Sequence, residues 1–350
     1  MLLVMRVNDK DREECEVMRI PSLLRISALL ACFASGPAVA QAPVSTEKVK
    51  LVVGIVSLTP SFGGIVLAAG NLWKPYLPNV EVERYETMSG MPLVNNLLAD
   101  KLDIAYLGDM PSIVLGSKSA LAQSYFIGMT EADDGEESAI YVKKGSPITT
   151  VKELAGRTVS VPFGGFTHRF AEVVMKAEAI EFKFVGQSPE VGLTNLQAGK
   201  VDAYMPWNPY GRLAELRGFG QKIADGTKYK FSSLRGIVVR KSFYDKHPDV
   251  VAGWMRAELD AHDMIRKRPD AAAKLIFDDW KKFDVPLEVI RNDFSYKIFP
   301  DDIPQKWRQV MVDSADFLLA HKFIDKAPDW ATFFNDAPIK KAASITSQMK

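Results

Sequence analysis

The stretch Thr158–Phe170 (TVSVPFGGFTHRF) decides the fold class, because it predicts a short buried strand, a glycine turn and a helix that begins near Thr167. Such a turn directs several free backbone N–H groups towards one point, at the positive end of a helix dipole. This arrangement is suited to binding an anion. A similar pattern lies upstream, where the strand Leu51–Val56 leads into Ser61–Gly64 (SFGG) and a helical stretch. The two units predict two lobes that face one ligand.

Composition and charge are those of an ordinary globular protein. Of the 350 residues, 47% are hydrophobic and 25% are charged, and this length suits about two domains. Lysine and arginine number 44 against 43 aspartate and glutamate, which gives a net charge of +1. The balance gives no indication of a nucleic acid or a membrane surface as a partner.

Residues 1–40 have the pattern of a secretion signal. Arg19 and Arg25 flank the start of a short apolar run, and Ala38 and Ala40 form an A-x-A cleavage site. The apolar run is too short to span a bilayer. We therefore expect an exported protein that is released into the periplasm.

Cysteine placement supports this interpretation. Cys15 and Cys32 are the only cysteines and both precede the cleavage site, so the mature chain has no thiol, disulfide or cysteine metal site. An alternative takes Leu29–Cys32 as a lipidation site with an anchor at Cys32, but Leu30 is bulky for that position. The stretch before Met18 is acidic, which is unusual for a signal, so residues 1–17 are a possible over-extension and Met18 an alternative start.

Strand and helix patterns alternate along the rest of the chain, which predicts an α/β fold. Predicted strands lie at 49–57, 80–85, 102–106, 122–128, 138–143, 182–185, 201–205 and 236–240. Lys144–Pro147 and Phe231–Gly236 are the predicted crossovers. Lobe one is therefore expected at 48–144 and lobe two at 145–231, and residues 232–350 are expected to return to lobe one and to end in helices.

Motifs for enzyme chemistry are missing from the sequence. There is no G-x-x-x-x-G-K-[ST], no H-E-x-x-H and no G-x-S-x-G. Gly63-Gly64 and Gly164-Gly165 do not fit G-x-G-x-x-G, so a dinucleotide fold is not indicated. We expect His247 to be a surface residue at a helix start, and we expect metal binding at neither His262 nor His321 and no cofactor.

Several polar residues allow two interpretations. His168 follows the second glycine turn, where a neutral imidazole can donate to an anion or can simply support the loop. Asp109 and Ser89 can contact a ligand or cap a helix, and for Asp109 we favour the cap. We interpret the acidic cluster Glu131–Glu137 as a solvated turn.

Trp207 is the most informative single residue. It directly follows a predicted strand and lies between Pro206 and Pro209, which would hold the indole at the strand end. Most tryptophans fill a core, but this position favours a pocket wall. The neighbouring Asn208 offers a donor and an acceptor without charge.

Short motifs spread over Val49–Asp329 resemble one family. They are Thr87–Pro92, Leu98–Ala105, Gly108–Pro111, Val151–Val159, Thr167-x-Arg169, Leu196–Ala203, Trp207-x-Pro209-Tyr210, Arg240–Phe243 and His247–Val251. In their order and spacing they are similar to the solute-binding proteins of nitrate, sulfonate and taurine ABC importers.

The resemblance implies a two-lobed periplasmic binding protein of type II. Each lobe would be a mixed sheet flanked by helices, with C-terminal helices, and ligand would be trapped by hinge closure. It implies a monomer without cofactor that delivers a small solute to an inner-membrane permease with a cytoplasmic ATPase. The residues that it places in the cleft are Thr59, Ser61, Phe62, Gly63, Ser89, Gly90, Met91, Gly108, Asp109, Met110, Phe163, Gly164, Gly165, Thr167, His168, Trp207 and Asn208.

The resemblance leaves the ligand class open. Many relatives carry an acid where this chain has Asn208, so a taurine-like zwitterion is less favoured, and no clamp of arginines is evident beyond Arg169. A sulfonate held by backbone N–H groups, another small oxyanion and a neutral heterocycle stacked on Trp207 and Phe163 all fit. The alternative function is an enzyme on this scaffold, such as a sulfinate desulfinase or a thiamin-pyrimidine synthase, which the lack of cysteine disfavours.

Overall fold

The computed structural model describes residues 42–119 and 123–349. The predicted signal at 1–40, its cleavage site and both cysteines lie outside these residues. Within the described part, no helix combines the length and the apolar character needed to cross a membrane.

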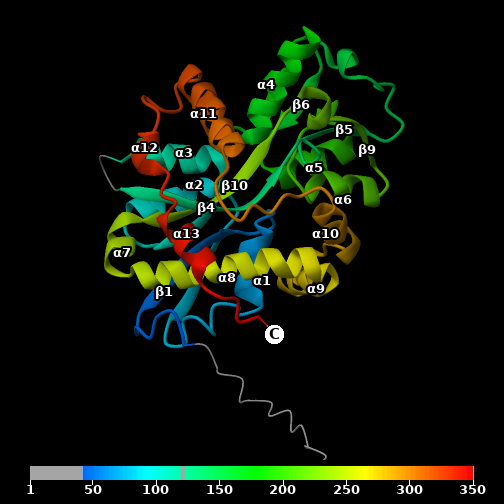
Figure 1. The fold of residues 1–350 in the computed structure, drawn as a ribbon. Coiled ribbons are helices and arrows are strands. Elements are labelled where there is room, and N and C mark those ends of the chain that lie inside the picture. The colour runs from blue at the N-terminus through cyan, green and yellow to red at the C-terminus, as the bar shows by residue number, and fades with distance from the viewer. Residues whose placement is uncertain (1–41, 120–122, 350) are drawn as a thin grey trace, which may run out of the picture. The chain divides into compact units, whose positions relative to one another are not determined.

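Two mixed five-stranded sheets form the framework of the described chain (Figure 1). The first has the order β2-β1-β3-β10-β4, and we call it and its helices lobe one. Its strands are β1 (Lys50–Val56), β2 (Glu81–Thr87), β3 (Ile104–Gly108), β4 (Ser124–Asp133) and β10 (Ser233–Arg240). β1 pairs in parallel with β2 and β3, whereas β10 pairs antiparallel with β3 and β4.

The second sheet, with its helices, is lobe two and has the order β7-β6-β8-β5-β9. Its strands are β5 (Ala139–Lys143), β6 (Thr158–Val161), β7 (Lys183–Gly186), β8 (Ala203–Tyr204) and β9 (Gly220–Asp225). β6 is parallel to β7 and β8, and β5 is antiparallel to β8 and β9. The predicted two-lobed α/β architecture with mixed sheets is confirmed.

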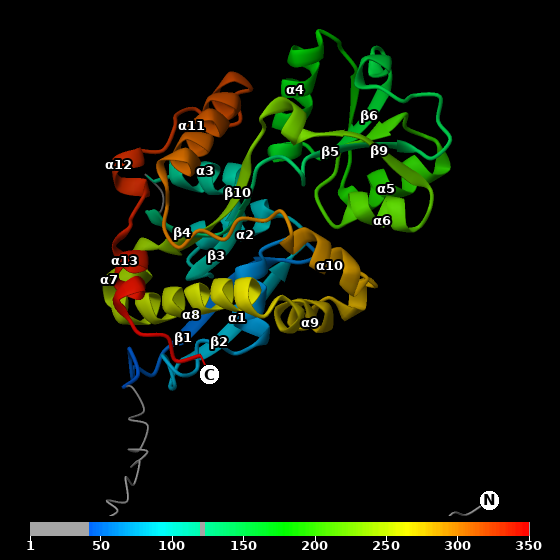
Figure 2. The ribbon, with the colours of Figure 1, turned by 45° about the vertical axis from the view of Figure 1, so that its right-hand side comes forward.

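Helices flank both sheets, and a run of helices ends the chain (Figure 2). Lobe one carries α1 (Phe62–Ala69), α2 (Gly90–Leu98) and α3 (Asp109–Ser117), and lobe two carries η1 (Val151–Leu154), α4 (Phe166–Glu178), α5 (Pro189–Ala198), α6 (Tyr210–Leu216) and η2 (Gly226–Tyr229). The later helices are α7 (Lys241–Lys246), α8 (Pro248–Lys267), α9 (Pro269–Asp279), η3 (Lys281–Phe283), α10 (Leu287–Phe294), α11 (Gln305–Ala320), α12 (Trp330–Phe333) and α13 (Ala337–Ser344).

The first crossing between the sheets differs from the prediction. β4 ends at Asp133 in the first sheet and β5 begins at Ala139 in the second, so the chain crosses at 134–138 and not at Lys144–Pro147. β5 belongs to lobe two because Ala139–Lys143 pairs with β9. A buried apolar run identifies a strand, but it does not reveal which sheet that strand joins. The return crossing lies between η2 and β10, near the predicted position.

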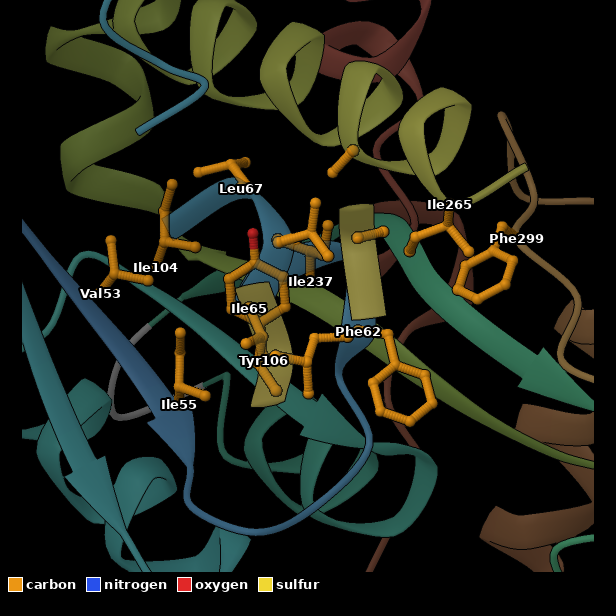
Figure 3. Close-up of a cluster of buried hydrophobic side chains, with 14 of the residues drawn as sticks. Val53, Ile55, Phe62, Ile65, Leu67, Ile104, Tyr106, Ile237, Ile265 and Phe299 are labelled. Atoms are coloured by element: carbon orange, nitrogen blue, oxygen red, sulfur yellow. The ribbon is translucent and has the colours of Figure 1, made fainter. Parts of the chain in front are cut away.

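The core of lobe one packs between its sheet and α8, around Tyr106 (Figure 3). Tyr106 is fully buried; its hydroxyl donates to Glu258 Oε2 at 2.7 Å and accepts from Trp254 Nε1 at 3.0 Å. Burial, followed by the Glu258 charge, raises the pKa of Tyr106 well above its ordinary value.

This core leaves no room for side chains at Gly63 and Gly64, which lie in the first turn of α1 and not in a turn before it as the sequence predicts. A Cβ on Gly64 would lie 2.4 Å from the Tyr106 ring, and one on Gly63 would lie 2.1 Å from Glu258 Oε1. Both glycines are therefore required by packing inside lobe one.

We expect Gly64→Ala to lower the free energy of unfolding by about 1–3 kcal/mol, because the added methyl overpacks the core against Tyr106. Gly165→Ala is the matched control, since no atom lies within 4 Å of its Cβ position, and it should cost about 1 kcal/mol or less as a helix cap. Urea unfolding measures both. Equal losses would contradict the packing argument.

Candidate functional site

A cavity of about 630 Å³ lies between the two lobes. Its walls come from the carboxyl ends of strands and the amino ends of helices, the usual ligand position in open α/β sheets. It is lined by Val56, Thr59, Met88, Ser89, Gly90, Met91, Gly108, Asp109, Pro111, Pro162, Phe163, Gly164, Gly165, Phe166, Gly186, Gln187, Ser188, Pro189, Glu190, Trp207 and Arg235.

Many of the residues expected in the cleft come together here. They are Thr59, Ser89, Gly90, Met91, Gly108, Asp109, Phe163, Gly164, Gly165 and Trp207. They belong to loops of both lobes, as expected for a site between lobes. Their contact with a ligand stays a prediction.

The other expected residues do not line this cavity: Ser61, Phe62, Gly63, Met110, Thr167, His168 and Asn208. The Phe62 ring packs against Trp280 and Phe294 at centroid distances of 5.9 and 5.2 Å, and Met110 is buried in the core of lobe one. Thr167 Oγ1 donates to the Pro162 carbonyl at 3.2 Å, which fixes the second glycine turn. These side chains build the walls rather than face the cavity.

The N-terminus of α1 is already paired with a carboxylate side chain of this protein. Phe62 N–H donates to Glu131 Oε2 at 2.9 Å, and Gly64 N–H donates to Thr130 Oγ1 at 3.1 Å. The anion cradle expected at Ser61–Gly64 is therefore occupied by a buried carboxylate. This glycine turn serves folding and is closed to a ligand oxyanion.

The N-terminus of α4 has the opposite surroundings. Gly164 has a positive φ of 73°, and no atom lies within 4 Å of a Cβ position on Gly164 or Gly165. Gly165 caps the helix without a side-chain hydrogen bond, and the first turn contains no acid. The space beside these two glycines is therefore open, and binding of an anion by the first N–H groups of α4 stays a prediction.

Helices α2, α3 and α5 also begin at the cavity. They differ in whether an acidic residue lies in the first turn of the helix. In α3, Asp109 Oδ1 accepts from Met110 N–H at 2.8 Å, and Glu190 lies in the first turn of α5. The first turn of α2 holds no acid, and its cap Ser89 makes no side-chain hydrogen bond to the helix. Of these four helices, α2 in lobe one and α4 in lobe two keep positive ends without a carboxylate.

Asp109 is engaged within the protein. It is 1% exposed, its Oδ2 accepts from Ser314 Oγ at 2.7 Å, and Arg169 Nη2 of lobe two lies 3.7 Å from the same oxygen. Arg169 also donates to the Ser232 carbonyl at 2.8 Å and lies over the Phe231 ring. Asp109 is therefore the first residue of α3 and a member of an ion pair, whereas the N-cap is Gly108 and not Asp109 as the favoured interpretation expected. Arg169 is directed away from the cavity.

Arg235 is a lining residue that sequence reasoning missed. Its guanidinium donates to Glu137 Oε2 at 2.8 Å and to Glu131 Oε1 at 3.2 Å, and Lys297 pairs with both carboxylates. Burial opposes ionisation, yet Arg235 and Lys297 lower the pKa of Glu137 to about 2. The available signal is an arginine next to a predicted buried strand, together with the acidic cluster Glu131–Glu137, which could supply its partners. This combination could have predicted that Arg235 is buried in an ion pair.

The acidic cluster Glu131–Glu137 is therefore not the solvated turn that was expected. Glu131, Asp133 and Glu137 are buried, and only Glu136 within this segment is strongly exposed among its acids. The acids are buried because Arg235, Lys297 and the α1 N-terminus neutralise them. Burial raises the pKa of Asp133 to about 6 despite the Lys297 charge.

Trp207 and Asn208 point to different places. Trp207 lines the cavity and packs edge-on against Tyr210 at 6.3 Å. Asn208 is buried, and its Nδ2 donates to Asp293 Oδ1 at 3.0 Å and to the Tyr296 hydroxyl at 2.6 Å. Because Asn208 is turned towards α10, its lack of charge no longer argues against a zwitterionic ligand.

His168 supports the glycine loop. Its ring packs on Phe163 at 4.8 Å, on Phe184 at 5.2 Å and on Phe317 at 5.3 Å. Burial lowers the pKa of His168, which favours the neutral imidazole. The structure thus favours the second interpretation of this residue. In the part of the chain that the structure describes, no group of three or more His, Cys, Asp or Glu is placed to hold a metal ion.

Comparison with known proteins finds a matching family model, sequence relatives and solved structures. A family model described as "NMT1/THI5 like" matches residues 134–272. A Bacillus subtilis (strain 168) protein named for the binding of aliphatic sulfonates is 28% identical over 269 residues, which cover 75% of this chain and 79% of that protein.

Two solved structures share the fold. The periplasmic aliphatic sulphonate binding protein of Escherichia coli matches with a TM-score of 0.70 at 19% identity, over 83% of this chain and 93% of the other. The alkanesulfonate-binding protein of Xanthomonas axonopodis pv. citri, bound to MOPS, matches with a TM-score of 0.71 at 17% identity, over 84% and 100%.

Replacing Glu137 by glutamine should lower the free energy of unfolding at pH 7 by about 3–5 kcal/mol, because Arg235 and Lys297 then lose a buried partner. The pKa of Glu137 is lowered to about 2, so its contribution is complete above about pH 4.3 and is lost as the pH falls towards 2. Urea unfolding between pH 2.5 and 7 measures this. The exposed Glu136→Gln is the control; an equal effect there would contradict the argument.

Proposed function

We propose that this chain, which matches the NMT1/THI5-like family model over residues 134–272 and shares the fold of a periplasmic sulphonate-binding protein, captures an organic sulfonate or a closely related organic oxyanion between its lobes. Its relatives are binding proteins for sulfonates and taurine. The chain would act as an exported monomer in the periplasm. It would then deliver the solute to an ABC permease in the inner membrane that is driven by a cytoplasmic ATPase.

The observation that carries this proposal is the pair of free helix ends in the cavity. α2 and α4 come from opposite lobes, and neither has an acid in its first turn or a side-chain cap. A sulfonate group has three oxygens and can accept hydrogen bonds from the N-terminal N–H groups of both α2 and α4. Such a ligand would connect the two lobes, as closure around a ligand requires.

The size and surface of the cavity support an organic tail. Met88, Met91 and Phe163 line it and are 52%, 44% and 55% exposed, and Trp207 adds an aromatic wall. A bare inorganic anion such as nitrate would leave most of the 630 Å³ unfilled and these side chains in water. An alkyl or aryl group attached to the oxyanion would cover them instead.

We expect 1-propanesulfonate and benzenesulfonate to stabilise the mature protein against heat, whereas nitrate, bicarbonate and neutral pyrimidines do not. A ligand at a hundred times its dissociation constant adds about 2.7 kcal/mol, which a thermal shift detects readily. Stabilisation by nitrate or a neutral pyrimidine alone would contradict the proposal. Recovery of a transformed ligand by mass spectrometry would instead favour the alternative of an enzyme.

Two variants, measured in the same thermal-shift assay, test whether the ligand binds against Trp207. Trp207→Ala removes a cavity wall and should reduce the shift more than His168→Ala, which acts from behind the loop. Equal or reversed reductions would count against a ligand stacked on Trp207.

Glu190 limits the charge of the ligand. Among the charged residues that line the cavity, Asp109 faces Arg169 and Arg235 faces two carboxylates. Glu190 accepts a hydrogen bond from the Tyr210 hydroxyl, and no ion pair with a described lysine or arginine is present. A second negative charge on the ligand would therefore meet an unneutralised carboxylate.

We expect Glu190→Gln to improve the binding of 1,3-propanedisulfonate at least threefold relative to 1-propanesulfonate, because the change removes repulsion of the second sulfonate. For 3-aminopropanesulfonate the same change should weaken binding. Isothermal titration calorimetry measures all three, with the exposed Glu181→Gln as control. The same response to both variants would exclude this role of Glu190.

A further inference from the structure

The two lobes also touch beside the cavity, where α4 of lobe two meets the C-terminal end of α11 of lobe one. The two helices are in contact, and Figure 1 shows α11 next to α4. Glu172 Oε1 of α4 lies 2.7 Å from His321 Nε2, and the His168 ring packs against Phe317 at 5.3 Å. We call this set, His168, Glu172, Phe317 and His321, the α4–α11 contact.

The surroundings of His321 require a proton on each ring nitrogen. Nδ1 lies 2.9 Å from the Phe317 carbonyl oxygen, and Nε2 lies 2.7 Å from the Glu172 carboxylate. Both partners are acceptors, so each nitrogen must donate, and only the imidazolium form does so. His321 is also the C-cap of α11, where the negative end of the helix dipole favours a cation.

The other groups around His321 leave Glu172 as its charged partner in the described chain. His168 of α4 lies 5.8 Å away between ring centroids, and its Nε2 is 3.8 Å from the same Glu172 oxygen. Burial lowers the pKa of His168, and the neighbouring His321 acts in the same direction, so the neutral form of His168 is favoured beside the imidazolium. Phe317 stacks on His321 at 4.3 Å, and Phe323 stacks at 6.2 Å.

A second ion pair also connects α4 to lobe one, at the start of α3. Arg169, one residue after His168, faces Asp109, which Ser314 of α11 also contacts. Asp313 of α11 acts on Arg169 through its charge. The contacts of Arg169 with Asp109 and Asp313 involve no histidine, the residue type whose charge changes between pH 5 and 8.

The α4–α11 contact and the cavity share one helix. Phe163 and Gly165 line the cavity at the start of α4, and the Phe163 ring packs on His168. An oxyanion bound by α2 and α4 draws α4 towards lobe one, and the ion pair of Glu172 with His321 draws the same helix in the same direction. The two interactions therefore reinforce each other, and affinity rises when the second is complete.

We propose that the doubly protonated His321 is a positioning residue that holds α4 against lobe one through Glu172 and thereby sets the affinity of the cavity for its ligand. The inference rests on the proposed binding of a sulfonate between the lobes. Both contacts of His321 need the imidazolium form, and histidine is the residue type that loses its charge as the pH rises between 5 and 8. Ligand affinity falls in the same direction.

The test is calorimetric titration of 1-propanesulfonate at pH 5.5 and pH 8. The dissociation constant of the wild type should increase about threefold to fivefold over this range, the size expected for one partly exposed ion pair. His321→Gln should give a flat profile near the wild-type value at pH 8. His321→Lys restores a charge that persists at pH 8 and should give a flat profile near the wild-type value at pH 5.5.

His247→Gln serves as the control, because His247 faces Glu47 away from the cavity and should leave the wild-type pH profile unchanged. A His321→Gln profile as steep as that of the wild type would overturn the proposal. So would a wild-type dissociation constant that does not change with pH. A variant that is only less stable would shift its unfolding temperature without flattening the pH profile.

A measurement without ligand separates this inference from the proposed function. Spin labels at Lys101→Cys of lobe one and Lys200→Cys of lobe two, both exposed, report the distance between the lobes in a chain whose mature part has no other cysteine. The wild-type distribution should broaden from pH 5.5 to 8, and that of His321→Gln should be broad at both. If the wild type binds no sulfonate, the proposed function fails, and the labels still decide whether His321 joins the lobes.

Discussion

The buried charges of Glu131, Glu137, Arg235 and Lys297 are the interaction on which the arrangement of the site depends. Burying isolated charges is very costly, so these four must neutralise each other where the chain passes between the lobes. Glu131 also fills the N-terminus of α1. By doing so it neutralises the positive end of α1, whereas the ends of α2 and α4 at the cavity have no acid in their first turns.

The two Phe-Gly-Gly segments show how much of the structure local sequence can predict. Phe62-Gly63-Gly64 and Phe163-Gly164-Gly165 have the same letters, and the sequence predicts both as turns between a strand and a helix. Only the second precedes its helix, whereas the first forms the opening turn of α1. The first pair of glycines is enclosed by Tyr106 and Glu258, whereas the second borders open space. Their different surroundings come from residues distant in the chain, which no local pattern contains.

The same reason explains what the sequence predicted and what it did not. Alternating strands and helices, the two lobes and many cavity residues follow from local periodicity, turn chemistry and family resemblance. The sheet that β5 joins, the burial of Glu131 and the orientation of Asn208 depend on partners such as β9, Arg235 and Asp293. Arg235 is 104 residues from Glu131, so a local sequence pattern around either residue cannot predict their ion pair.

The position of β10 has a consequence for the order in which the molecule can assemble. β10 lies between β3 and β4 in the first sheet, but it is made after every strand of the second. Lobe two is one continuous segment and can close its sheet as soon as β9 has emerged. Lobe one must hold β3 and β4 apart until Ser233–Arg240 arrives, and pairings between distant segments form slowly. The edges of β3 and β4 stay open for that interval, which makes lobe one the half that is vulnerable to misassembly before the chain is complete.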